Sequence, residues 1–97
     1  MPRPITWSEE APLLVAKSEP SVGLVGTTVV AVDGFSNSGD TGDDEGYNAS
    51  TNSWKSLTAD PMGRNEACTG SISGLLYVAG GSHDGLLTIL TSTNRST

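Results

Sequence analysis

Basic residues are scarce in this sequence of 97 residues, which has 5 Lys and Arg against 11 Asp and Glu and a formal net charge of −6. A chain without a basic stripe is poorly suited to nucleic acid or an anionic membrane, so we expect neither as a partner. The sequence has no apolar run of the roughly 18 residues that a membrane-spanning helix needs. Its first residues lack the apolar core of a secretory signal, and we expect a cytoplasmic protein.

Cysteine occurs once, at Cys68, so no disulfide can form within the chain. Its place in an expected strand favours a small buried hydrophobic residue over a reactive thiol. The chain offers no set of His and Cys residues for a transition metal, and we expect no cofactor. Four of the eleven acidic residues lie between positions 35 and 46, but their spacing does not match a calcium-binding EF-hand loop. We therefore expect a solvated, mobile loop without a metal.

No segment of helix length has helical periodicity, and apolar residues alternate in short runs between Gly, Pro, Asn and Asp. This pattern predicts eight short strands. They are Ile5 to Ser8, Ser21 to Val25, Thr28 to Val32, Glu45 to Asn48, Ser53 to Leu57, Ala67 to Ile72, Leu75 to Ala79 and Thr88 to Thr91.

The chain repeats itself after 47 positions. Trp54 repeats Trp7, Gly70 repeats Gly23, and residues 76–81 repeat residues 29–34. A period of about 40 to 50 residues, with one tryptophan and a glycine pair after an apolar strand, is typical of propeller blades. The predicted fold class is therefore all-β, with two four-stranded antiparallel propeller blades per chain.

The two blades are expected to be incomplete as a unit. Residues 18–58 form blade 1, residues 65–97 form a blade 2 that lacks its outer strand, and residues 1–8 are an outer strand without a blade. A propeller needs about 4 to 8 blades, and two alone leave sheet faces and edges open. We expect residues 1–8 of one copy to complete blade 2 of the next, in a head-to-tail homo-oligomer. Ring closure favours a six-bladed homotrimer over a dimer or a tetramer.

Two stretches of the chain resemble the kelch repeat. One is Leu-Tyr-Val-Ala-Gly-Gly at 76–81 after the Ser73-Gly74 turn, and the other is residues 47–54, which end in Trp54. The first repeat departs from the pattern, because Asp33-Gly34 replaces the glycine pair and Lys17 replaces the arginine. The resemblance implies a β-propeller whose loops, on one rim and at the channel mouth, bind partners. Trp54 is expected to pack between adjacent blades.

Candidate ligand-binding residues follow from this placement of the loops. They are Lys17, Glu19, Arg64, Asn65, Glu66, His83 and Asp84. A structural role for the repeated basic and acidic pairs, bridging neighbouring blades, is the favoured interpretation, and binding of a carboxylate or of sugar hydroxyls is the alternative. His83, beside Asp84 in a glycine turn, is expected on the surface rather than as a base. The connection that contains residues 82–85 is expected to be about five residues shorter than its counterpart at 34–46, because Ser-Thr-Asn at 50–52 recurs at 92–94, after 42 residues instead of 47.

The favoured function is a non-catalytic module that assembles into a ring and presents its rim loops to a protein or a carbohydrate. No catalytic residue is assigned. One alternative is a carbohydrate-active enzyme resembling the sugar-acid epimerases of this fold, which would use Arg64, Glu66 and His83. Another is a propeller fragment or engineered minimal unit without a ligand.

Overall fold

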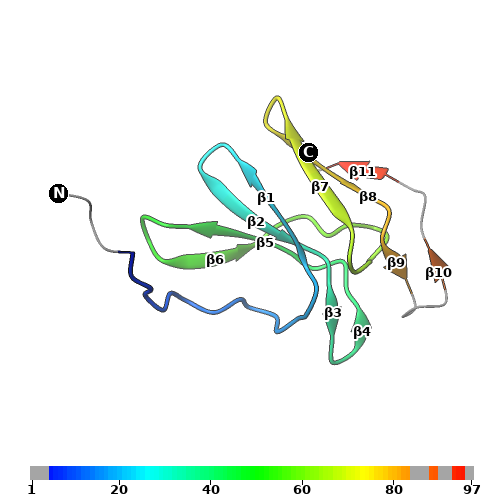
Figure 1. The fold of residues 1–97 in the computed structure, drawn as a ribbon, viewed down its shortest axis with the longest axis horizontal. Coiled ribbons are helices and arrows are strands. Elements are labelled where there is room, and N and C mark those ends of the chain that lie inside the picture. The colour runs from blue at the N-terminus through cyan, green and yellow to red at the C-terminus, as the bar shows by residue number, and fades with distance from the viewer. Residues whose placement is uncertain (1–4, 84–87, 90–92, 96–97) are drawn as a thin grey trace.

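The computed structural model describes residues 5–83, 88–89 and 93–95, and within them the chain forms strands and no helix (Figure 1). Two antiparallel sheets lie side by side, and a short hairpin extends from each. The described residues contain no helix long and apolar enough to cross a membrane.

The first sheet has four strands in the order β1-β2-β5-β6. Their bounds are Ser21–Val25 for β1, Thr28–Val32 for β2, Asp44–Asn48 for β5 and Ser53–Ser56 for β6. Each strand pairs with the next along the chain, in the up-and-down order expected for a propeller blade. The bounds of β1 and β2 are those predicted.

The second sheet has three strands, in the order β11-β8-β7. They are β7 at Cys68–Ile72, β8 at Leu75–Ala79 and β11 at Thr93–Arg95. The prediction that the third strand spans Thr88 to Thr91 is wrong. Residues Thr88–Ile89 form β10, which pairs with β9 at Ser82–His83 and not with β8.

The two short hairpins follow the same strand of each repeat. β3 (Phe35–Ser36) pairs with β4 (Gly39–Asp40) after β2, and β9 pairs with β10 after β8. Both hairpins lie at the end of the sheets opposite the β1–β2 and β7–β8 turns (Figure 1). Thr93 pairs with Ala79 as Asp44 pairs with Val32, so the second connection, 80–92, is two residues longer than the first, 33–43. The expectation of a shorter second loop is wrong, because the third strand begins later than its sequence suggested.

The core lies between the two sheets. Val30 and Val32 of β2 pack against Leu76 and Val78 of β8, and all four are buried. Gly23 makes this approach possible, because an added Cβ there would overlap a methyl group of Leu76. The hydroxyls of Thr69 and Ser71 also donate to the main-chain oxygens of Val22 (2.9 Å) and Leu24 (2.5 Å).

The side of β7 that points away from the first sheet is open. Because Thr69 and Ser71 face β1, Cys68, Gly70 and Ile72 face outward by strand alternation. The expectation that Cys68 is buried is therefore wrong, and its thiol is exposed.

The N-terminal segment lies against the first sheet without joining it. The indole N–H of Trp54 donates to the main-chain oxygen of Ala11 at 2.8 Å. The buried Glu45 carboxylate accepts the backbone N–H groups of Leu14 and Val15, at 2.7 and 3.0 Å. Residues Ile5 to Ser8, predicted as a strand, have no strand partner within the described chain, and Trp7 is 95% exposed.

Gly63, in the connection from β6 to β7, tests the close approach of two loops. A Cβ at Gly63 would lie 2.8 Å from both the backbone N of Gly42 and the backbone carbon of Thr41. Because neither loop backbone can rotate away as a side chain does, Gly63→Ala should lower the free energy of unfolding by about 1–3 kcal/mol. Thr27→Ala is the control, since Thr27 is exposed in the β1–β2 turn. Denaturant unfolding measures the free energy of unfolding of both variants. Equal losses of this free energy in the two variants would contradict the assignment.

Candidate functional site

Arg64 is fully buried between the two sheets, in the connection from β6 to β7. Its Nε donates to the main-chain oxygen of Met62 at 3.2 Å, and its Nη1 donates to that of Gly80 at 3.1 Å. Two carboxylates approach the same guanidinium, Asp60 at 3.3 Å and Asp33 at 3.7 Å from Nε. Since Asp33 follows β2 and Gly80 follows β8, Arg64 connects the two sheets.

Lys17 occupies the equivalent position in the first repeat, and its side chain is also fully buried. Its Nζ donates to the main-chain oxygen of Asp43 at 2.7 Å and lies 3.3 Å from the Asp43 carboxylate. The basic residues therefore bind carboxylates of neighbouring elements, rather than reaching towards an open channel. Breaking a buried ion pair costs about 3–5 kcal/mol, so neither charge is free to turn towards a ligand.

Asp33 has the conformation that the repeat requires of a glycine. Its φ is 56°, and Gly80 and Gly81, at the corresponding point of the second repeat, have φ values of 72° and 88°. A short polar side chain tolerates this left-handed region better than most residues. Asp33 therefore fits at a position where the second repeat has a glycine, and its carboxyl group lies against Arg64.

The carboxyl groups of Asp33, Asp44 and Asp60 share this buried region, and their negative charges repel one another. Burial raises the pKa of Asp33 to about 9, aided by a hydrogen bond to Asp60 and by the charges of Asp60 and Asp44, and opposed by Arg64. Burial also raises the pKa of Asp44 to about 6, although the backbone N–H of Asp33 donates to its carboxylate at 3.2 Å. At neutral pH Asp33 is therefore protonated, which reduces the charge beside Arg64.

Glu19 and Glu66 are the exposed acidic residues of the two repeats, and they lie next to each other. The backbone N–H of Glu66 donates to the main-chain oxygen of Glu19 at 3.3 Å, and both residues are left-handed, with φ of 54° and 55°. A hydrogen bond to Glu66 and its charge raise the pKa of Glu19. Each repeat thus contributes one carboxyl group to a single acidic spot.

Asn65 and His83 join the connection at 57–67 to the rim hairpins. The Asn65 amide donates to the Asp40 carboxylate of β4 at 2.5 Å, and its backbone exchanges hydrogen bonds with Ser82 of β9. The His83 Nδ1 lies 2.5 Å from the main-chain oxygen of Gly63. His83 is half-buried in β9, so the expectation of a surface turn residue is wrong. Asp84 lies outside the described residues.

The acidic segment at 35–46 is part of the structure and not a mobile loop. Asp40 is in β4, Asp43 binds Lys17, and Asp44 and Glu45 begin β5. Glu45 is fully buried. No group of three metal-binding side chains occurs within the described parts of the chain. The solvated-loop expectation was wrong because these carboxylates accept hydrogen bonds from segments far away in sequence.

Asp33, Asp60 and Glu45 were missed as parts of the site by sequence reasoning. Asp33 and Asp60 meet Arg64 from different connections, and Glu45 meets the N-terminal segment. The one available signal was Asp33, an acidic residue directly after an apolar strand, where burial imposes a partner.

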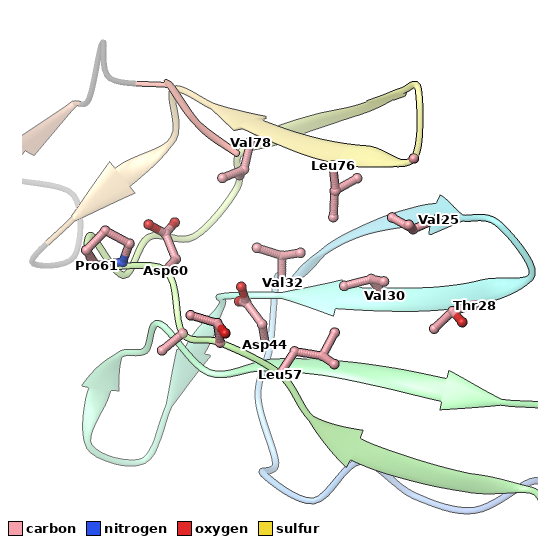
Figure 2. Close-up of a pocket in the computed structure, with 13 residues that line it drawn as sticks. Val25, Thr28, Val30, Val32, Asp44, Leu57, Asp60, Pro61, Leu76 and Val78 are labelled. Carbon is pink, nitrogen blue, oxygen red and sulfur yellow. The ribbon is translucent and has the colours of Figure 1, made fainter. Parts of the chain in front are cut away.

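A pocket of about 480 Å³ lies between the two sheets (Figure 2). Its walls are mainly aliphatic, and the carboxyl groups of Asp44 and Asp60 also line it. The lining residues include Val25, Val30, Leu57, Thr58, Leu76 and Val78, with Asp44 and Asp60.

No protein-family model matches the sequence. Among solved structures the chain is similar to YjhT, a kelch-repeat propeller protein, with a TM-score of 0.71 and 25% sequence identity. The match covers 80% of this chain and 25% of that protein, so the chain spans about a quarter of the length of its structural relative. The described chain thus resembles part of a kelch propeller.

The buried carboxyl groups predict a pH dependence of folding. The pKa of Asp33 rises from 3.8 to about 9 on folding, so the stability due to its bound proton is complete below about 3.8 and is lost as the pH rises through 9. Asp33→Asn imitates the neutral acid and tolerates the same φ, and it should flatten the decline of unfolding free energy between about pH 5 and pH 9. Denaturant titrations measure this, with the exposed Glu9→Gln variant as control. An unchanged slope in Asp33→Asn would contradict the assignment.

Proposed function

We propose that the chain is a two-blade building unit of a kelch-type propeller, which closes by joining copies of itself head to tail. The observation that carries this proposal is the repetition of one interface. The front of the first sheet, with Gly23, Val30 and Val32, packs against the back of the second, with Leu76 and Val78. Each sheet has a second side that matches the other by the same repeat.

The unused sides correspond residue by residue to the packed ones. On the second sheet Gly70 and Tyr77 stand where Gly23 and Val30 stand on the first. On the first sheet Val22 and Val29 stand where Thr69 and Leu76 stand on the second. Val22 is 57% exposed, and an added Cβ at Gly70 would meet nothing within 4 Å. In a ring, Val29 of the next copy would occupy the space above Gly70, as Leu76 occupies that above Gly23.

A head-to-tail contact forms a closed ring when the rotation per chain divides the circle. Three copies of a two-blade unit make six blades, within the usual range of about four to eight, and we favour this homotrimer. Closure removes the exposed apolar sides and sheet edges, which would otherwise lead to unspecific association.

The assembled ring is proposed as a non-catalytic scaffold that binds a protein or carbohydrate partner. The buried pairing of Lys17 and Arg64 supports this, because it commits both basic side chains to contacts within the protein. The groups left for a partner are the rim hairpins and the exposed carboxyl groups of Glu19 and Glu66. Repetition around a ring would multiply this acidic spot, which favours partners that donate hydrogen bonds or carry positive charge.

The solution mass, measured by light scattering after size exclusion, tests the assembly. We expect about three times the chain mass of 10.0 kDa. Gly70→Leu fills the space reserved for Val29 of the next copy, and it should weaken the assembly about tenfold because overpacking an interface costs about 1–3 kcal/mol. Thr27→Leu, in the exposed β1–β2 turn, is the control and should leave the mass unchanged. A wild-type mass equal to that of one chain would overturn the proposal.

A further inference from the structure

The pocket between the sheets has an unusual position for a ligand site. Val25 and Val30 line it from the first sheet, and Leu76 and Val78 line it from β8. Leu57, the residue after β6, also lines it. Figure 2 shows these aliphatic side chains on both sides of the opening. The pocket thus lies inside the interface between two blades, where a propeller is normally packed.

The first sheet shows what fills the equivalent place. Trp54 of β6 packs beside Tyr47 of β5, with ring centroids 5.1 Å apart. Its indole N–H donates to the main-chain oxygen of Ala11, which lies in the segment leading into this repeat. The outer strand of the sheet therefore places one tryptophan on the back of the sheet, against the connecting segment.

The 47-residue repeat transfers this arrangement to the pocket. Trp7 is the counterpart of Trp54, and Thr58 is the counterpart of Ala11. Thr58 lines the pocket. The pocket also lies at the back of the second sheet, the side that corresponds to the one on which Trp54 lies. The repeat thus predicts that an indole equivalent to Trp54 lies in this pocket. It also predicts that the main-chain oxygen of Thr58 accepts a hydrogen bond from the indole N–H.

Trp7 of the same chain is not at this place. It is 95% exposed, and its segment lies at the far end of the molecule, across the first sheet from β7 and β8 (Figure 1). Within the described residues, no strand pairs with the outer edge of β11. Within the described residues, the second sheet therefore lacks both the strand and the tryptophan that the first sheet has.

We propose that the pocket is the binding site for Trp7 of a second copy, with its indole N–H donating to the main-chain oxygen of Thr58. This inference rests on the proposed self-assembly and specifies its chemistry. The segment Ile5 to Ser8 of the second copy pairs with the outer edge of β11, and Trp7 fills the pocket beside Leu57 and Thr58. An aromatic side chain buries about 150–250 Å² in such a contact, which makes Trp7 the main anchor of each joint.

The environment of Trp7 tests this directly in the full chain. Incorporation of 5-fluorotryptophan provides one fluorine resonance for Trp7 and one for Trp54, and the Trp7→Phe variant assigns them. In the assembled protein we expect the Trp7 resonance to lose its sensitivity to solvent deuterium and to a soluble paramagnetic quencher. In samples diluted until the assembly dissociates, we expect that sensitivity to return.

A charge placed in the pocket provides the second variant. Leu57→Lys puts a longer, hydrated side chain in the pocket wall and should weaken assembly by at least about tenfold, because it takes the space of the indole even when it pairs with Asp44 or Asp60. Phe35→Lys is the matched control, since Phe35 has nearly the same exposure, 44% against 41%, and lies on the β3–β4 hairpin outside the pocket. It should leave both the mass and the Trp7 resonance unchanged.

The outcomes separate this inference from the proposed function. Assembled wild-type protein in which Trp7 remains as accessible as in the dissociated chain would overturn the Trp7 site and leave the self-assembly intact. Equal effects of Leu57→Lys and Phe35→Lys on assembly would also overturn the site. A wild-type mass of a single chain at every concentration would overturn both. If Leu57→Lys does not fold, the wild-type fluorine measurement still decides.

Discussion

The packing of one sheet on the next is the interaction on which this structure depends. Neither sheet has a helix over its faces within the described residues, so an apolar face is buried only where another sheet covers it. The contact of Val30 and Val32 with Leu76 and Val78 provides the hydrophobic core of the described residues. Gly23 sets the distance of this contact by leaving room for Leu76. Every further blade contact of a ring would repeat this unit.

Buried charges hold the same interface at its hairpin end. Arg64 and Lys17 bind main-chain oxygens as well as carboxyl groups, so Arg64 fixes the connection between the two sheets and Lys17 fixes two segments of the first repeat. A buried ion pair adds little net stability, but it fixes geometry because an unpaired partner is costly. The excess of acids in this region is relieved by the raised pKa of Asp33 and Asp44. The basic residues of the two repeats thus have structural contacts here, and their role towards a ligand stays a prediction.

Two local predictions failed for one physical reason. The acidic segment at 35–46 was expected to be solvated, and the third strand of the second sheet was placed at Thr88 to Thr91, because local pattern was the available information. In the structure Asp43 binds Lys17, and Glu45 binds backbone N–H groups about 30 positions away. The register of β11 depends equally on pairing with β8, a partner that is distant in sequence. Contacts between segments that are distant in the sequence produce no periodic pattern in it.

The sequence by itself determined the all-β class, most strand bounds and the 47-residue repeat, because these follow from the alternation of apolar residues and from local backbone preferences. Tertiary structure alone decided that Arg64 and Lys17 are buried, that Glu19 lies beside Glu66, and that a pocket lined by Thr58 opens between the sheets. These features arise where segments from different repeats meet. Burial, and with it the pKa of Asp33, exists only after that meeting.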